Sequence, residues 1–283
     1  MKFAPTPYKI STITATGSIR QEIDLGLFYQ HVDVVTPDSS TGILYIEYGE
    51  KKQHTFFKGF HKKQTIARRK KKENKRFDNQ ATIIIKLSEG QQVNMKVFRN
   101  GNIQMTGLKQ INQGMDAIKY LIDRLTEFYK TTCNEMLPNY EGEQIVVHDY
   151  RICLINSDFR IGFEIKRDKL CKIMQQKYSV FCNYEPCIYP GVKIQYNFNT
   201  DYNLDEGKCH CREECNGKGT GSGDGDCKKI TIAVFQSGCV IITGAQNIMQ
   251  IENSYRFICN VIKTHSADVY KPPCTELISL ATA

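Results

Sequence analysis

Two eleven-residue stretches of this chain are closely similar: VFRNGNIQMTG at 97–107 and VFQSGCVIITG at 234–244. Five of the eleven positions are identical, and the second stretch follows the first by 137 residues. Each reads as a strand, a tight Asn-Gly or Ser-Gly turn, and a second strand. A hairpin that occurs twice predicts a fold built from one unit made twice, which restricts the possible architectures more than any other feature.

The residues around each hairpin repeat as well. A candidate strand opens each copy, at 10–16 and 151–156, and another precedes each hairpin, at 81–87 and 192–198. The predicted unit is therefore a strand, a short helix, three or four antiparallel strands and a long helix, which is an α+β fold. Apolar residues at spacings of three and four predict the long helices, and they are Ile111, Met115, Ile118, Ile122 and Leu125 in the first copy, and Ile248, Ile251, Tyr255, Ile258 and Ile262 in the second.

Two segments do not fit the repeat. One is a basic run and the other is rich in Cys, Gly and Asp, and both are expected to interrupt a sheet without belonging to it. The predicted ranges are 1–131 for the first repeat with a basic insertion at about 50–76, 132–148 for a linker, 149–271 for the second repeat with an insertion at 199–229, and 272–283 for a C-terminal tail.

Alternation along the strands predicts one buried and one open face in each repeat. Helices on one side of an antiparallel sheet leave the other face free, and a half-apolar free face is typical of a binding surface. The open sets are Asn94, Lys96, Phe98, Asn100, Asn102, Gln104 and Thr106 in the first copy, and Thr231, Ala233, Phe235, Ser237, Cys239, Ile241 and Thr243 in the second. The helix-facing sets are Val93, Met95, Val97, Ile103 and Met105, and Ile230, Ile232, Val234, Val240 and Ile242.

The composition excludes some classes of protein. The chain is 41% hydrophobic, enough for a core, yet no apolar run reaches the about 18–20 residues of a membrane helix. With no recognisable signal peptide, the twelve cysteines are expected to be thiols or metal ligands in a reducing intracellular compartment. The net charge of +8 favours an anionic partner. The run at 58–76 holds ten Lys or Arg, and is either a solvated loop with a possible nuclear-import role or an arm that contacts phosphates.

Enzyme motifs are missing. None of the six histidines pairs with a motif-grade Ser, Cys or carboxylate, and the P-loop and HExxH patterns are absent. The glycine-rich GKGTGSGDGD at 217–226 lacks the strand before it and the helix after it that a phosphate cradle needs. We therefore expect a protein that is not an enzyme.

The repeated F-x-x-G-x-x-x-x-T-G pattern, together with NYEPCIYPGVKIQY at 183–196, resembles the TATA-box-binding protein family. That family carries Tyr-Glu-Pro-x-x-Phe-Pro-Gly at this place in its second repeat. The resemblance covers 8–130 and 149–265, apart from the two insertions. It implies a saddle in which a curved antiparallel sheet binds the minor groove of A·T-rich duplex DNA and the helices lie on the convex side. It also implies a transcription initiation factor that is monomeric or weakly self-associating. The drift from the family suggests a copy carried by a large DNA virus, which would act in the nucleus or in a cytoplasmic virus factory.

The resemblance assigns DNA-contacting roles residue by residue. Phe98 and Phe235 correspond to one wedge in each repeat, where an apolar side chain enters a base step and partly unstacks it. Tyr189 corresponds to the other wedge of the second repeat, and Phe77 is the nearest candidate in the first. The remaining positions on the groove floor are Thr106, Thr243 and Ile241, with Gln104 and Lys96 where the family has apolar residues.

The first strand of each repeat departs from the family. The family places an Asn there, and the corresponding residues are Lys9 and Leu154, unless a shift of register puts Asn156 in the second position. Lysine is a donor and can still reach the acceptors of the minor groove. The resemblance thus supports minor-groove binding rather than recognition of a TATA sequence. The alternative is an interaction scaffold that keeps the fold and has lost DNA bending.

The segment at 183–196 also implies protein partners. Glu185 corresponds to the family's contact to initiation factor IIB, with Cys187 in place of a second acidic residue and Ile188 beside it. The implied partners are a protein like initiation factor IIB and the RNA polymerase machinery.

Four cysteines cluster in the second insertion. Cys209, Cys211, Cys215 and Cys227 follow the spacing C-x-C-x3-C-x11-C, which is not a standard zinc-finger spacing. Thiolates suit tetrahedral zinc, and a metal can order a loop that has no core. The cluster is therefore either a zinc site or a loosely ordered loop of thiols, and no other cofactor is expected.

Overall fold

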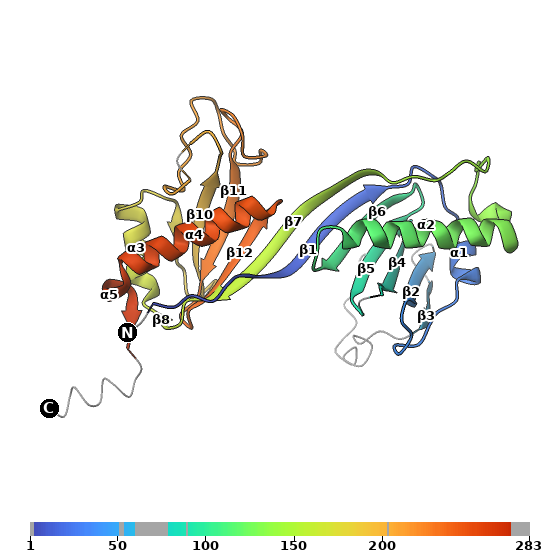
Figure 1. Cartoon of the computed structure of the whole chain (residues 1–283), viewed down its shortest axis with the longest axis horizontal. Coiled ribbons are helices and arrows are strands. Elements are labelled where there is room, and N and C mark those ends of the chain that lie inside the picture. Colours follow the sequence, from blue (N-terminus) through green and yellow to red (C-terminus); the bar gives the residue numbers. More distant parts are fainter. Residues whose placement is uncertain (1–2, 51–53, 60–78, 89, 203, 273–283) are drawn as a thin grey trace. The chain divides into compact units, whose positions relative to one another are not determined.

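The computed structural model describes residues 3–50, 54–59, 79–88, 90–202 and 204–272. The chain forms two compact units (Figure 1). The first unit is Thr12–Cys153; the second unit combines the residues up to Ser11 with those from Leu154 onward. These limits differ from the predicted repeat boundaries, because the segment predicted as a linker belongs to the first unit and the first residues of the chain belong to the second.

Packing explains both differences. In the segment predicted as a linker, Met136 is fully buried and its carbonyl oxygen accepts the Asp24 N–H at 2.9 Å. At the start of the chain, the Tyr255 hydroxyl donates to the Thr6 carbonyl oxygen at 3.0 Å. Neither contact leaves a sequence pattern, since each depends on residues far apart in the chain.

The first unit contains an antiparallel sheet with the strand order β3-β2-β4-β5-β6-β1. A long helix, α2, lies across one face of this sheet (Figure 1). The predicted helix is confirmed, although Ile111 precedes it and is 39% exposed. The bounds are β1 Lys9–Ser18, α1 Leu25–His31, β2 Gly42–Glu50, β3 His54–Gly59, β4 Gln80–Lys86, β5 Gln92–Phe98, β6 Asn102–Leu108, α2 Gln113–Thr131 and a 3-10 turn at Asn134–Met136.

The second unit repeats this plan with the strand order β7-β12-β11-β10-β9. Its long helix, α4, contacts β10, β11 and β12, so the predicted helix and sheet are again confirmed. No helix of the described residues is long and apolar enough to span a membrane. The bounds are β7 His148–Arg160, β8 Glu164–Ile165, α3 Arg167–Gln176, β9 Cys182–Asn183, β10 Val192–Phe198, β11 Lys228–Val234, β12 Cys239–Ala245, α4 Ile248–Thr264, α5 Ser266–Val269 and β13 Tyr270–Lys271.

The two hairpin turns require the glycine that both stretches carry. Gly101 has a φ of +78° and Gly238 a φ of +74°, in the region that side chains other than glycine rarely adopt. Backbone also approaches both closely: an added Cβ would lie 2.5 Å from the Gln21 carbonyl oxygen at Gly101 and 2.3 Å from the Phe163 carbonyl oxygen at Gly238. The same turn and the same close approach explain why glycine recurs at this place.

The predicted faces of the strands are confirmed with one correction. Every residue of the two helix-facing sets is buried, at 2% exposure or less. Ala233, predicted on the open face, is also buried, at 4% exposure, because it is small and lies between Lys193 and Ile241 on the neighbouring strands.

The basic insertion was expected to lie outside the sheet, and for its first part this is wrong. Residues 54–59 form β3, which pairs with β2 at the edge of the first sheet. The remainder, 60–78, lies outside the described residues, and with it the wedge candidate Phe77 and most of the basic run. In the second insertion, the described residues 199–202 and 204–227 form no helix and no strand of the sheet, as expected for a loop. The last two residues of the predicted insertion, Lys228 and Lys229, instead begin β11.

Candidate nucleic-acid interface

The second open face comprises the half-buried side chains on the helix-free side of β7, β11 and β12. Thr231 pairs across the strands with Thr243, and the Thr243 hydroxyl donates to Asn156 Oδ1 at 2.5 Å. Because Ile155 and Ser157 are buried on the core side, Asn156 and Leu154 both lie on the open side of β7. The structure thus brings Asn156 to the floor of this face beside Thr243, as the shifted register would require.

Two aromatic rings lie together at the end of this face. The ring centroids of Tyr189 and Phe235 are 5.7 Å apart, and their planes meet at 61°. Gly191 leaves room for both, since an added Cβ would lie 2.9 Å from the Tyr189 ring and 3.2 Å from the Phe235 ring. Lys193 Nζ lies over the Tyr189 ring, 4.6 Å from its centroid, and this cation–π contact is favourable. The two residues predicted as wedges of the second repeat therefore form one half-exposed aromatic pair.

The turn between β11 and β12 holds Phe235 in place. Its N–H donates to the Cys239 carbonyl oxygen at 2.9 Å, and its carbonyl oxygen accepts the Gly238 N–H at 3.0 Å. Val234 is fully buried beside it, and alternation therefore directs Phe235 to the opposite, open side.

The loop between β9 and β10 is tied to the body of the second unit by Arg167. This side chain donates to the Pro190 carbonyl oxygen and to Gln236 Oε1, and its guanidinium lies 4.9 Å from the Tyr184 ring centroid. Within the loop, the Glu185 carbonyl oxygen accepts the N–H groups of residues 188 and 189. The three predicted partner-binding residues, Glu185, Cys187 and Ile188, are exposed, Ile188 to 79%.

The first open face lies on the helix-free side of β2, β4, β5, β6 and β1, and it is more polar. The pairs Asn94 with Thr106 and Lys96 with Gln104 face one another across β5 and β6. One row across the sheet consists of Glu47, Thr82, Lys96, Gln104 and Thr16.

The Glu47 carboxylate was missed by the sequence analysis. It accepts the Tyr45 hydroxyl at 2.8 Å, and the Tyr45 ring in turn stacks on Phe57 of β3 with centroids 6.4 Å apart. Alternation within 42–50 would have placed Glu47 on this side, but that run was not assigned to a strand. A carboxylate in this row opposes the charge of Lys96 and would repel phosphate.

Phe98 ends β5 at the edge of the first open face, where it pairs with Gln80. It is half-buried and borders a hollow of about 610 Å³ that is also lined by Arg20, Glu22, Asn79, Arg99 and Asn100. Phe77, the candidate for the second wedge of the first repeat, lies outside the described residues.

Lys9 does not lie on the first open face. It is the exposed first residue of β1 and belongs to the second unit, whereas the neighbour of Gln104 on β1 is Thr16. The sequence analysis also missed Asp158, which faces Ile241 across β7 and β12 and accepts a hydrogen bond from the Ser11 hydroxyl. Each open face therefore contains one acidic side chain that the repeat pattern did not reveal.

The family comparison agrees with this geometry. Residues 149–265 match the family model "Transcription factor TFIID (or TATA-binding protein, TBP)". These residues of the second repeat are similar to the TBP family. A TATA-box-binding protein-like protein of Acanthamoeba polyphaga mimivirus is 29% identical over 273 residues, which cover 91% of this chain. The predicted resemblance and the α+β repeat fold are confirmed, and the matching family model is one of transcription factors.

The matched proteins differ from this chain in length or in sequence. The chain spans 65% of the length of the mimivirus protein. Among solved structures, Methanococcus jannaschii TBP matches with 17% identity and a TM-score of 0.48, over 92% of this chain and 99% of that one.

Proposed function

We propose that this chain binds duplex DNA through the open faces of its two repeats, that it enters the minor groove, and that it bends the duplex to start transcription. Two observations support the proposal: each repeat leaves one face of its sheet free of helices, and residues 149–265 match the TBP family. The half-apolar second open face suits the floor of a minor groove, where few charged groups meet the protein.

The aromatic pair Tyr189–Phe235 is the single observation that carries the proposal. The two rings lie 5.7 Å apart and are half-exposed at the end of a sheet face, and together they would enter one base step. Unstacking a step costs a few kcal/mol, and a bent duplex repays that cost by touching more protein. Gly191 keeps the space beside both rings open, and Lys193 adds a cation that can contact the adjacent phosphate.

The first open face would contact the other half of the site differently. Lys96 and the Gln104 amide are donors, and the minor groove of A·T pairs presents only acceptors. Phe98 would be the wedge of this half, next to the hollow it borders. The first face thus offers polar donors where the second offers Ile241 and Cys239, so the two halves would prefer different sequences.

Protein partners would approach the loop between β9 and β10. Glu185 and Ile188 are exposed there and the loop backbone is fixed by Arg167, which suits a preformed docking site for a protein like initiation factor IIB. Recruitment of an RNA polymerase would follow from that contact. Basic residues of the insertion at 58–76 would add phosphate contacts and make DNA affinity fall steeply with salt.

Bending is measured by energy transfer between dyes at the two ends of a short A·T-rich duplex. The wild-type chain should raise the transfer efficiency, and a variant with both Phe98→Ala and Phe235→Ala should not, even at saturation. Met249→Ala is the matched control, because Met249 is an exposed apolar side chain on α4, on the helix side of the second unit. Bending by the double variant equal to wild type would refute the wedges. A wild-type chain that bends no A·T-rich duplex would refute the proposal in favour of a protein-binding scaffold.

A further inference from the structure

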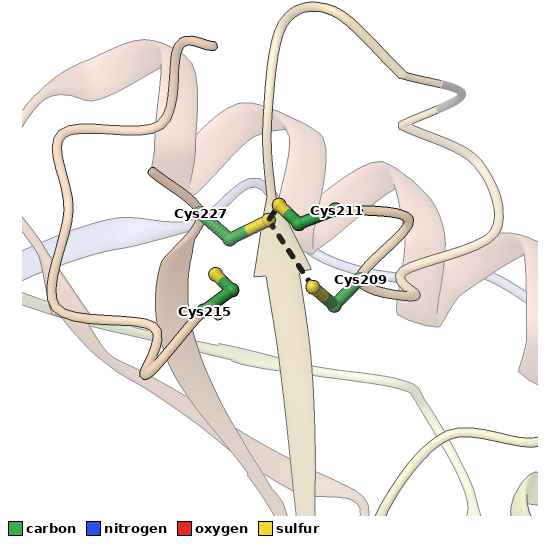
Figure 2. Close-up of side chains that lie close together, drawn as sticks. All are labelled: Cys209, Cys211, Cys215 and Cys227. Atoms are coloured by element: carbon green, nitrogen blue, oxygen red, sulfur yellow. Dashed lines mark hydrogen bonds between the residues drawn. The ribbon is translucent and has the colours of Figure 1, made fainter. Parts of the chain in front are cut away.

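The loop between β10 and β11 brings four cysteines together (Figure 2). The Sγ atoms of Cys209, Cys211, Cys215 and Cys227 all lie within 4.8 Å of one another, and all four are free thiols. We propose that these four side chains bind one zinc ion. This site is independent of DNA binding and would stand if the proposed function failed.

The distances between the sulfurs suit a tetrahedral ion. Four sulfurs at about 2.3 Å from zinc lie about 3.8 Å from one another. Cys227 Sγ is 3.7 Å from Cys209 Sγ and 3.3 Å from Cys211 Sγ, whereas a disulfide would need about 2.05 Å. The cluster thus has the size of a tetrathiolate site.

His210 lies within the cluster in sequence, but it is not a fifth candidate. Its Nε2 pairs with Glu206 Oε2 at 3.0 Å, and its ring lies 5.6 Å from that of Tyr202. The donor set is therefore four thiolates without imidazole or carboxylate, a set that selects zinc over magnesium and calcium. On binding, the four thiols release their protons to solvent and the site keeps a net charge of about −2.

A side-chain amide already donates to one of the sulfurs. Asn199 Nδ2 donates to Cys227 Sγ at 3.5 Å. Donors around ligand sulfurs stabilise the negative charge that four thiolates bring together, and they orient the ligands toward a common centre.

The loop between β10 and β11 has little hydrophobic core to hold it in one conformation. Among the described residues 199–202 and 204–227, Cys227 is the only hydrophobic side chain that is buried. Five glycines of this stretch have positive φ, so its backbone is costly to hold in one conformation. A metal supplies cross-links where a segment cannot build a core.

The zinc ion would secure the loop against the helix side of the second unit. Gln250 Nε2 of α4 donates to the Thr220 carbonyl oxygen at 2.9 Å, and the Tyr196 hydroxyl of β10 donates to the Leu204 carbonyl oxygen at 2.8 Å. Cys227 directly precedes β11, so the ion would also fix the start of the strand that carries Thr231. Its role is structural, because four protein ligands leave no open position.

The test uses the full chain, purified under reducing conditions without added metal, and elemental analysis. The expected result is one zinc ion per chain in wild type and loss of zinc in Cys211→Ser and Cys227→Ser. Cys133→Ser is the matched control, because Cys133 lies outside the cluster, and His210→Asn tests the exclusion of imidazole. Both should retain one zinc ion.

A second readout does not depend on folding of the variants. Alkylation of the wild-type chain should spare all four cysteines until a strong chelator is added, and zinc should restore their protection. Cobalt should give the absorption of a tetrahedral tetrathiolate site. Zinc-free wild-type protein, alkylation unaffected by the chelator, or zinc lost from His210→Asn but kept in Cys211→Ser would each overturn the proposal.

Discussion

Gly238 offers the sharpest test of how the repeated hairpin is held. In Gly238→Ala the new Cβ would meet the Phe163 carbonyl oxygen at 2.3 Å, well inside van der Waals contact. That carbonyl has little freedom to retreat, because the Ile161 N–H donates to the Gly238 carbonyl oxygen and the Ile165 N–H to the Gln236 carbonyl oxygen, both at 2.8 Å. Either the turn moves or these hydrogen bonds lengthen.

The magnitude has two parts. Holding alanine at a φ of +74° costs about 1–2 kcal/mol, and relieving the overlap costs a further 1–3 kcal/mol, roughly. Gly223→Ala is the matched control in the same unit, since Gly223 has a φ of +95° but no atom within 4 Å of the added Cβ. We expect it to lose about 1–2 kcal/mol, so the two variants should differ by about 1–3 kcal/mol.

The assay is urea unfolding followed by far-ultraviolet circular dichroism, because the chain contains no tryptophan. Hydrogen exchange at the amides of β12 assigns the transition to the second unit. Gly238→Ala should shift the midpoint more than Gly223→Ala at an unchanged slope. Equal free energies of unfolding for the two variants would show that backbone strain alone, and not the close approach to Phe163, accounts for the glycine.

Three further predictions follow from the second unit. Lys193→Ala should weaken DNA binding and reduce the salt slope by about 1, as measured by anisotropy titrations at several salt concentrations; an unchanged slope would remove Lys193 from the interface. Arg167→Ala should loosen the loop before β10 and speed amide exchange there, while Arg167→Lys restores only part of the protection, since lysine lacks the planar fork; unchanged exchange would refute the anchor. Burial raises the pKa of the Cys259 thiol to about 11, so at pH 8 iodoacetamide should label exposed Cys187 first and leave Cys259 unlabelled in the native chain.

The pH dependence of Cys259 has a defined sign. A folded-state pKa raised above the unfolded value favours the protonated thiol in the native chain, so its contribution to stability is present below the unfolded pKa of about 8.5. That contribution should be lost as the pH rises toward about 11. Mass spectrometry of peptides labelled at pH 8 and pH 10.5 would follow this change as increased labelling of Cys259.

The repeat alone predicted much of the fold. Alternation from Phe235 and Phe98 assigned the buried faces. Successive side chains of a strand point to opposite faces of the sheet, and the face that packs on the core carries apolar side chains. The turns at Gly101 and Gly238 were also predictable, since few residues other than glycine tolerate positive φ. These features depend only on residues that are close together in the sequence, so the sequence alone reveals them.

What the repeat could not predict depends on contacts between distant segments. β3 belongs to the sheet although its sequence leads into a basic run, because pairing with β2 outweighs composition. Lys9 belongs to the second unit because the chain before β1 packs on α4, through Tyr8 and Tyr255. The acidic side chains Glu47 and Asp158 remained hidden, since neither lies in the repeated stretch and their strands carry no shared motif.

Minor-groove binding is the central claim, and base substitution in the duplex tests it most directly. An inosine·cytosine pair presents the minor-groove acceptors of A·T but the major-groove pattern of G·C, whereas G·C adds a donor in the minor groove. Affinity at fixed salt should be the same for an A·T-rich duplex and its inosine·cytosine counterpart, and lower by about 1–3 kcal/mol for each G·C pair that replaces A·T. An inosine·cytosine duplex that binds as weakly as the G·C duplex would contradict the account.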